Sequence, residues 1–109
     1  MNDDQKFLLA NLKANGPQSS WDWQADHRFA LAAGLTEEAE KIRLVLRSHA
    51  PTIFRDEVMY SVKHVKARRL RALQALVKKG LVRSAWVGTG AGGKNEFSVN
   101  RCRAYFLVE

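Results

Sequence analysis

The stretch from Asp56 to Asn100 constrains the fold most, because its residue pattern changes from helical to strand-like at one glycine. Helical runs lie on both sides of a short turn, Gly80 ends the second run, and two alternating runs then flank a glycine-rich loop. The order is therefore helix, helix, hairpin. The expected elements are a short helix Asp56–Tyr60, a long helix Val65–Lys79, strands Arg83–Val87 and Glu96–Asn100, and a loop at 88–94.

The long helix has two contrasting faces. Apolar residues recur about every 3.6 positions, which predicts one side packed on a core. That side comprises Val62, Leu70, Leu73, Leu76 and Val77, and the opposite side comprises His64, Ala67, Arg68, Arg71, Ala75 and Lys78. No acidic residue occurs from Lys63 to Arg83, whereas ordinary solvated helix faces mix acids with bases to gain i,i+4 pairs. A slim basic face favours a nucleic-acid partner and suits the major groove of DNA, about 12 Å wide.

The segment 71–82, which reads RALQALVKKGLV and precedes the glycine-rich hairpin, resembles the end of the recognition helix and the wing of the winged helix-turn-helix superfamily. In that superfamily the helix lies in the major groove, and the hairpin loop touches the DNA backbone or the minor groove. The resemblance implies these roles for His64, Arg68 and Arg71 on the helix and for Lys94 in the loop. With their basic neighbours, the candidate DNA-binding residues are Lys63, His64, Lys66, Arg68, Arg69, Arg71, Lys78 and Lys94.

The expected fold is mainly α with a small β-hairpin (α+β), a winged helix-turn-helix domain at 36–109 with an N-terminal helical extension at 1–35. Further helices are expected at Asp3–Ala14, Gln24–Ala33 and Thr36–His49. Thr52–Phe54 suits the small strand that precedes the second helix of this fold and pairs with the hairpin. The apolar end Tyr105–Val108 should add a strand, pack on the N-terminal helices or meet a second subunit.

Trp21 and Trp23 lie close together in a polar connector. In a soluble protein, large aromatic side chains are usually anchors of the core or of an interface. We therefore expect both tryptophans to be buried rather than to provide surfaces for base stacking.

Charge is distributed unevenly along the 109 residues, whose net charge is +7. Residues 1–40 hold three basic and seven acidic side chains, whereas residues 41–83 hold twelve basic and two acidic ones. This concentration points to a polyanion rather than to charge for general solubility. The single cysteine, Cys102, excludes an intramolecular disulfide and a four-cysteine zinc site, and the N-terminus lacks the pattern of a secretory signal. We expect a cytoplasmic or nucleoid-associated protein that does not enter a membrane.

Catalytic and cofactor motifs are weak. Gly88 to Lys94 matches the glycine and lysine spacing of a P-loop, but Asn95 replaces the Ser or Thr that would bind magnesium, and a strand rather than a helix is expected to follow. His27, His49 and His64 are too scattered for a metal cluster. We expect no cofactor, no metal and no enzymatic activity.

The leading hypothesis is a small sequence-specific regulator that binds double-stranded DNA, of the kind encoded by phages or mobile elements. A second hypothesis makes the fold a scaffold for protein interaction, or an inhibitor of a nucleic-acid enzyme, through the N-terminal region. RNA binding is a third hypothesis, although the chain lacks a ribonucleoprotein or GXXG motif. Apolar material at both ends of the chain also suggests a homodimer.

Overall fold

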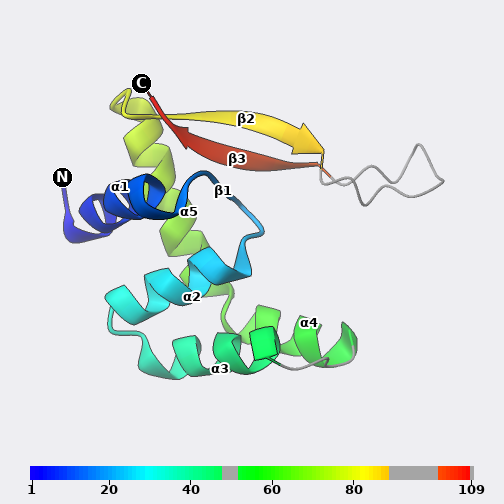
Figure 1. Ribbon diagram of the computed structural model, residues 1–109. Coiled ribbons are helices and arrows are strands. Elements are labelled where there is room, and N and C mark those ends of the chain that lie inside the picture. Colours follow the sequence, from blue (N-terminus) through cyan, green and yellow to red (C-terminus); the bar gives the residue numbers. More distant parts are fainter. Residues whose placement is uncertain (48–51, 89–100, 109) are drawn as a thin grey trace.

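The computed structural model describes residues 1–47, 52–88 and 101–108. Within these ranges the protein is an α+β fold, with five helices and a small three-stranded antiparallel sheet (Figure 1). The elements are α1 (Asp3–Asn15), β1 (Gln18–Ser19), α2 (Trp23–Ala32), α3 (Thr36–Arg47), α4 (Thr52–Ser61), α5 (Lys63–Lys78), β2 (Val82–Gly88) and β3 (Arg101–Leu107). No helix in the described ranges is long and apolar enough to cross a membrane.

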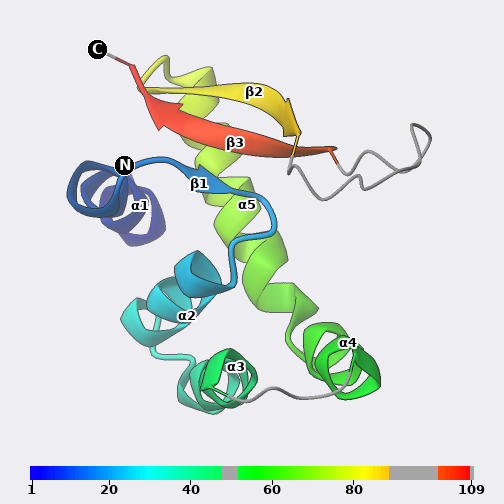
Figure 2. The same cartoon turned by 45° about the vertical axis from the view of Figure 1, so that its right-hand side comes forward.

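Helix α5 is the central element. The sheet lies at its C-terminal end, α3 and α4 lie at its N-terminal end, and α1 and α2 pack along one side (Figures 1 and 2). Its buried side chains Val65, Leu73 and Leu76 join a single core that also includes residues of α1, α2, α3, β2 and β3. Residues 1–35 contribute Leu8 and Phe29 to that same core. The N-terminal helices are therefore packed as closely on α5 as the hairpin is.

Local signals set several helix ends. The side chains of Asn2 and Asp22 accept hydrogen bonds from the backbone N–H groups of Gln5 and Ala25, which caps α1 and α2. Gly16 ends α1 with a φ of 80°, a conformation that favours glycine. One residue, Val62, separates α4 from α5, so the turn between them is tighter than the four-residue turn expected from the sequence.

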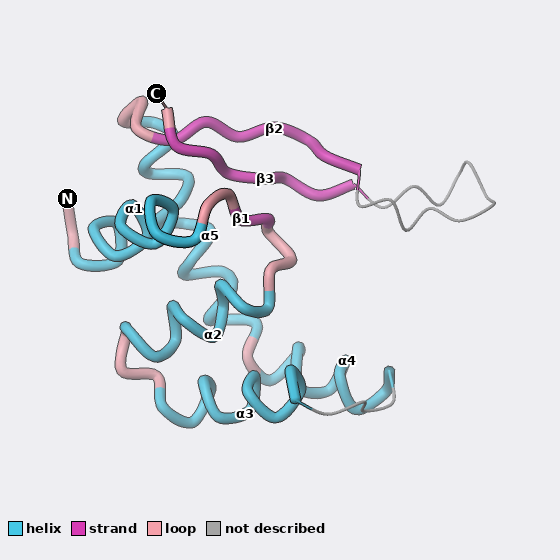
Figure 3. The backbone as a smooth tube through the Cα atoms, viewed as in Figure 1, coloured by secondary structure: helices cyan, strands magenta, loops and turns pink. Residues whose placement is uncertain are grey.

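The sheet differs from the expected one in two strands. Thr52–Phe54 begins helix α4, so the prediction of a strand there is wrong. The strand that pairs with the hairpin is β1, whose Gln18 and Ser19 lie opposite Tyr105 and Ala104 of β3 (Figure 3). A three-residue β preference is weak, and the tertiary pairing decides the outcome.

The second hairpin strand is β3, Arg101–Leu107, which pairs along its length with β2. The C-terminal residues therefore add a strand, which is one of the three roles expected for them. The expected strand Glu96–Asn100 and the loop residue Lys94 lie outside the described residues.

A buried ionic network joins α5 to the N-terminal segments. The guanidinium of Arg69 is fully buried, and its Nε donates to Asp26 Oδ1 on α2 at 2.7 Å. Its Nη1 donates to Gln18 Oε1 at 2.7 Å, while Nη2 donates to the carbonyls of Ser19 and Ser20. Burial of a charge costs several kcal/mol unless its hydrogen bonds are satisfied, and here Asp26 also supplies the opposite charge. Arg69 thus fixes α5 to β1, to α2 and to the segment that follows β1.

Arg69→Met should lower the free energy of unfolding by about 3–5 kcal/mol, because it leaves the Asp26 carboxylate buried without its closest partner. Urea unfolding followed by circular dichroism measures this loss. Arg71→Met is the matched control, since Arg71 is exposed on the same helix and its replacement should change stability by about 0.5 kcal/mol or less. Equal losses in the two variants would show that the network does not stabilise the fold.

Candidate nucleic-acid interface

A stripe of exposed side chains runs along α5. Residues three or four positions apart lie above one another on a helix, and five such positions face solvent. The stripe consists of Lys63, Ala67, Arg71, Gln74 and Lys78. We call these five residues the α5 stripe. Lys63, Arg71 and Lys78 form no ion pair with any side chain in the described part of the chain.

Two predicted DNA contacts lie at the edge of this stripe and have acidic partners. Arg68 donates from Nε and Nη2 to the carboxylate of Asp4 on α1, at 2.8 and 3.0 Å. His64 Nε2 lies 3.0 Å from Glu38 Oε2 on α3. The bond to Asp4 raises the pKa of Arg68, and the bond to His64 is the main reason that the pKa of Glu38 is lowered. The prediction of an acid-free face is therefore correct for the helix alone and incomplete for the folded protein.

The other predicted contacts are placed differently. Arg69 lies in the interior, where every nitrogen of its guanidinium is hydrogen-bonded, so it is not part of the exposed surface. Lys66 is mostly buried, with its ammonium 3.7 Å from Asp26 Oδ2 and without a hydrogen-bond partner among the described groups. Desolvation is the main reason that the pKa of Lys66 is lowered from its ordinary value, and Asp26 opposes this shift. Of the seven predicted contacts on α5, five therefore lie on the exposed stripe or at its edge, and two, Lys66 and Arg69, lie in the interior.

Trp21 is not buried as expected. Its side chain is 55% exposed, whereas Trp23 is half-buried and packs against the core. The Lys66 ammonium lies 4.0 Å from the centroid of the Trp21 ring, within the range of a cation–π contact. The prediction of burial is therefore wrong for Trp21.

Two further exposed aromatic residues were not predicted from the sequence as candidate contacts. Tyr60 at the end of α4 is 72% exposed, and the Lys63 ammonium lies 4.3 Å from its ring centroid. Trp86 on β2 is 62% exposed, and the Arg103 guanidinium from the opposite position of β3 lies 4.9 Å from its ring. Only the pairing of β2 with β3 places Arg103 beside Trp86, so the sequence alone does not predict this contact.

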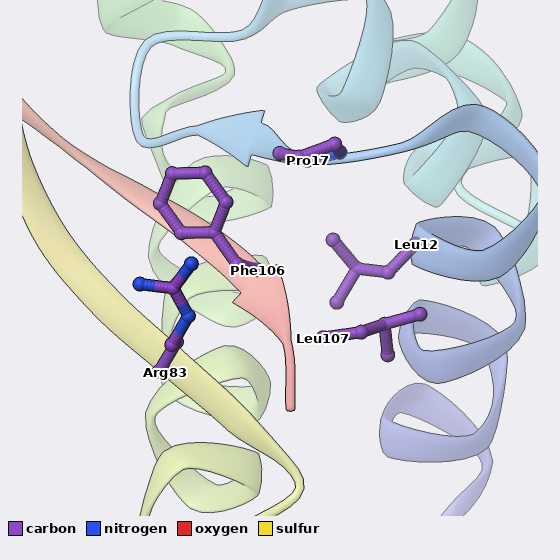
Figure 4. Close-up of a pocket in the computed structure, with 5 residues that line it drawn as sticks. All are labelled: Leu12, Pro17, Arg83, Phe106 and Leu107. Atoms are coloured by element: carbon purple, nitrogen blue, oxygen red, sulfur yellow. The ribbon is translucent and has the colours of Figure 1, made fainter. Parts of the chain in front are cut away.

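A hollow of about 330 Å³ lies on another part of the surface, between α1 and the hairpin (Figure 4). It is lined by Leu12, Pro17, Arg83, Phe106 and Leu107. The Arg83 guanidinium lies 4.7 Å from the Phe106 ring, and Figure 4 shows the two side chains facing each other across the strands. One cation and no deep enclosure make this hollow a weaker candidate for a polyanion than α5.

No family model, curated protein or solved structure matches this chain. Among the described residues, no group of three or more His, Cys, Asp or Glu side chains is placed to hold a metal ion.

Lys66→Met should be at least as stable as the parent protein at neutral pH, because burial disfavours the ammonium and methionine keeps the apolar stem. Between the lowered pKa of Lys66 and its ordinary value of 10.5, the unfolded chain holds a proton that the folded chain does not, so this group makes the parent more stable as pH rises. The stability gap between variant and parent should shrink toward pH 10.5 in urea unfolding. Lys13→Met, at an exposed position of α1, is the matched control. A constant gap for Lys66→Met would contradict the expectation.

Proposed function

We propose that the protein binds double-stranded DNA through the α5 stripe, as a small regulator of the winged-helix type. The observation that carries the proposal is the set of three exposed cations, Lys63, Arg71 and Lys78, in line on one helix with small Ala67 between them. Each has no ionic partner among the described residues. A polyanion would supply the missing negative charge, and duplex DNA presents it at regular spacing.

The order of elements supports a winged-helix arrangement. Helix α1, strand β1 and helix α2 are followed after an interval by helix α5 and the β2–β3 hairpin, and the short strand β1 pairs with β3 in the sheet order β1-β3-β2. The short strand of the expected winged domain thus comes before α2 rather than before α4. On this assignment α1 is the first helix of the domain, and α3 and α4 form an insertion before α5.

The chemistry of the stripe assigns different tasks to its members. Arg71, at the centre, has a planar fork of donors that matches a guanine edge or a phosphate. Lys63 and Lys78, at the two ends, act as point charges for phosphates on either side of the groove. Gln74 donates to the hydroxyl of Tyr105 at 3.1 Å, so the stripe is braced against the sheet near its C-terminal end.

Arg71→Ala should weaken binding to a duplex by about 1–3 kcal/mol, because it removes the central forked donor. Lys63→Ala with Lys78→Ala should lower the slope of log affinity against log salt by about two, since two phosphate contacts are lost. Fluorescence anisotropy of a labelled duplex at several salt concentrations measures both. Lys13→Ala with Lys41→Ala is the charge-matched control on α1 and α3. If the control weakened binding as much as the stripe variants do, the interaction would depend only on net charge and not on the α5 stripe.

Asp4→Asn should strengthen duplex binding several-fold, because it frees the Arg68 guanidinium and removes a carboxylate at the edge of the stripe. The combined variant Asp4→Asn with Arg68→Gln tests the cause, since the gain should disappear when the freed guanidinium is also removed. The same anisotropy titration is the measurement. Unchanged affinity in Asp4→Asn would place Arg68 outside the interface.

A further inference from the structure

Three exposed aromatic side chains lie along one side of the protein, each with a cation on or beside its ring. They are Tyr60 with Lys63, Trp21 with Lys66, and Trp86 with Arg103. We call Tyr60, Trp21 and Trp86 the aromatic strip. They come from α4, from the connector after β1 and from β2, and are thus brought together only by the fold.

Two hollows meet at Trp21: one reaches Lys63, which lies over the Tyr60 ring, and the other reaches Trp86. One, of about 130 Å³, lies between Trp21, Trp23, Met59 and the lysines 63 and 66. The other, of about 410 Å³, continues from Trp21 past Leu70 and Gln74 to Trp86 and Arg103. In both views the α4–α5 junction, the connector after β1 and the outer half of the hairpin lie along the same side (Figures 1 and 2). Trp21 and Trp86 therefore line one hollow beside α5, and Tyr60 contacts Lys63, which lines the adjoining hollow.

The backbone around Trp21 is fixed. Arg69 binds the carbonyls of Ser19 and Ser20, and the Ser20 N–H donates to the Arg103 carbonyl at 2.8 Å. The connector is thus tied to α5 on one side and to β3 on the other. A large apolar ring held on the surface by such contacts is preorganised for a ligand rather than left exposed by chance.

Two cations of the hollows have unused capacity. The ammonium of Lys66 is buried beside Asp26 and the Trp21 ring, so Lys63 and Arg103 are the cations that an occupant would reach. Lys63 and Arg103 form no ion pair with any described side chain. An occupant must therefore supply both flat apolar faces for the rings and acceptor oxygens for the cations.

From this juxtaposition we infer that the aromatic strip binds unpaired nucleotides of a DNA strand, with bases stacked on Trp21 and Trp86 and the backbone held by Lys63 and Arg103. Base stacking on aromatic side chains combined with a basic groove is the general chemistry of single-strand binding, and it tolerates any base sequence. A protein segment would match the rings but would need a row of acidic groups to match the cations. The inference goes beyond duplex binding by the α5 stripe, because it shares only Lys63 with the three cations proposed to bind the duplex and concerns a different form of DNA.

The test compares three probes: a blunt duplex, the same duplex with a tail of about six thymidines, and a thymidine strand of about twelve residues. Wild-type protein should bind the tailed duplex at least tenfold more tightly than the blunt one. Trp21→Leu and Trp86→Leu keep apolar bulk but remove the aromatic face, and each should cost roughly tenfold on the tailed duplex and on the single strand. Neither should change affinity for the blunt duplex. The conservative variants Trp21→Phe and Trp86→Phe should restore most of the binding.

Matched controls separate the strip from general effects. Leu44→Ala removes an exposed apolar side chain on α3 and should leave all three affinities unchanged. Arg83→Gln removes the cation stacked on Phe106 in the separate hollow and should also have no effect, whereas Arg103→Gln should weaken binding of the tail. Quenching of tryptophan fluorescence by the thymidine strand should decrease in Trp21→Leu and in Trp86→Leu.

The outcomes distinguish the two proposals. Equal affinity for tailed and blunt duplexes overturns the inference about the strip and leaves duplex binding by α5 standing. Binding of the tail and the single strand without binding of the blunt duplex supports the strip and overturns the duplex proposal. A uridine strand that binds tenfold more tightly than the thymidine strand would overturn the assignment to DNA. Loss of binding to an acidic peptide, but not to any strand, in the tryptophan variants would also overturn it.

Discussion

The buried guanidinium of Arg69 is the constraint on which the rest of the arrangement depends. A cation without access to water must be surrounded by acceptors. These are Gln18 and the Ser19 carbonyl on β1, the Ser20 carbonyl just after it, and Asp26 on α2. Gln18 in turn donates from Nε2 to Asn11 Oδ1 on α1 at 3.4 Å. One side chain of α5 thereby sets the positions of β1 and α2 and leads on to α1. Apolar packing tolerates small shifts of these helices, whereas hydrogen bonds require particular directions between donor and acceptor. The network therefore defines which face of α5 is exposed.

The amphipathic pattern of α5 could be predicted from sequence because it is a local property of a helix with about 3.6 residues per turn. The outer positions of Ala67, Arg71 and Lys78 follow from that period alone. The burial of Arg69, but not of Arg68, does not follow from that period. The two residues are separated by one step of about 100° around the helix. Arginine is almost always exposed unless it is paired with an acidic group. The partner Asp26 lies 43 positions away in sequence, so only the tertiary fold decides which arginine becomes internal.

The charges around the candidate interface also could not be predicted from the sequence alone. Counting charges along residues 63–83 describes a purely basic surface, but α1 and α3 carry Asp4 and Glu38 to its edge. Arg68 is thereby paired with Asp4 and His64 contacts Glu38, while Lys63, Arg71 and Lys78 are not paired with any described acid. The predictions of a strand at Thr52–Phe54 and of a buried Trp21 were wrong for a related reason. Strand pairing and the burial of an aromatic ring both depend on segments that are distant in sequence. The sequence therefore located the helix that carries the candidate interface, but not its boundaries on the surface.

Lys63 links the two proposed binding surfaces, because it begins the α5 stripe and its ammonium also lies over Tyr60 in the aromatic strip. A strand that leaves a duplex seated on the stripe could therefore enter the two hollows at Trp21 without crossing uncharged surface. Opening a closed duplex costs a few kcal/mol for each unpaired and unstacked base, and stacking on an aromatic ring returns about 1–3 kcal/mol. With these magnitudes the strip roughly offsets the cost of opening and does not drive it. DNA that already contains unpaired bases avoids the cost, so a protein with both surfaces would select ends, junctions or melted sites over an intact duplex of the same sequence.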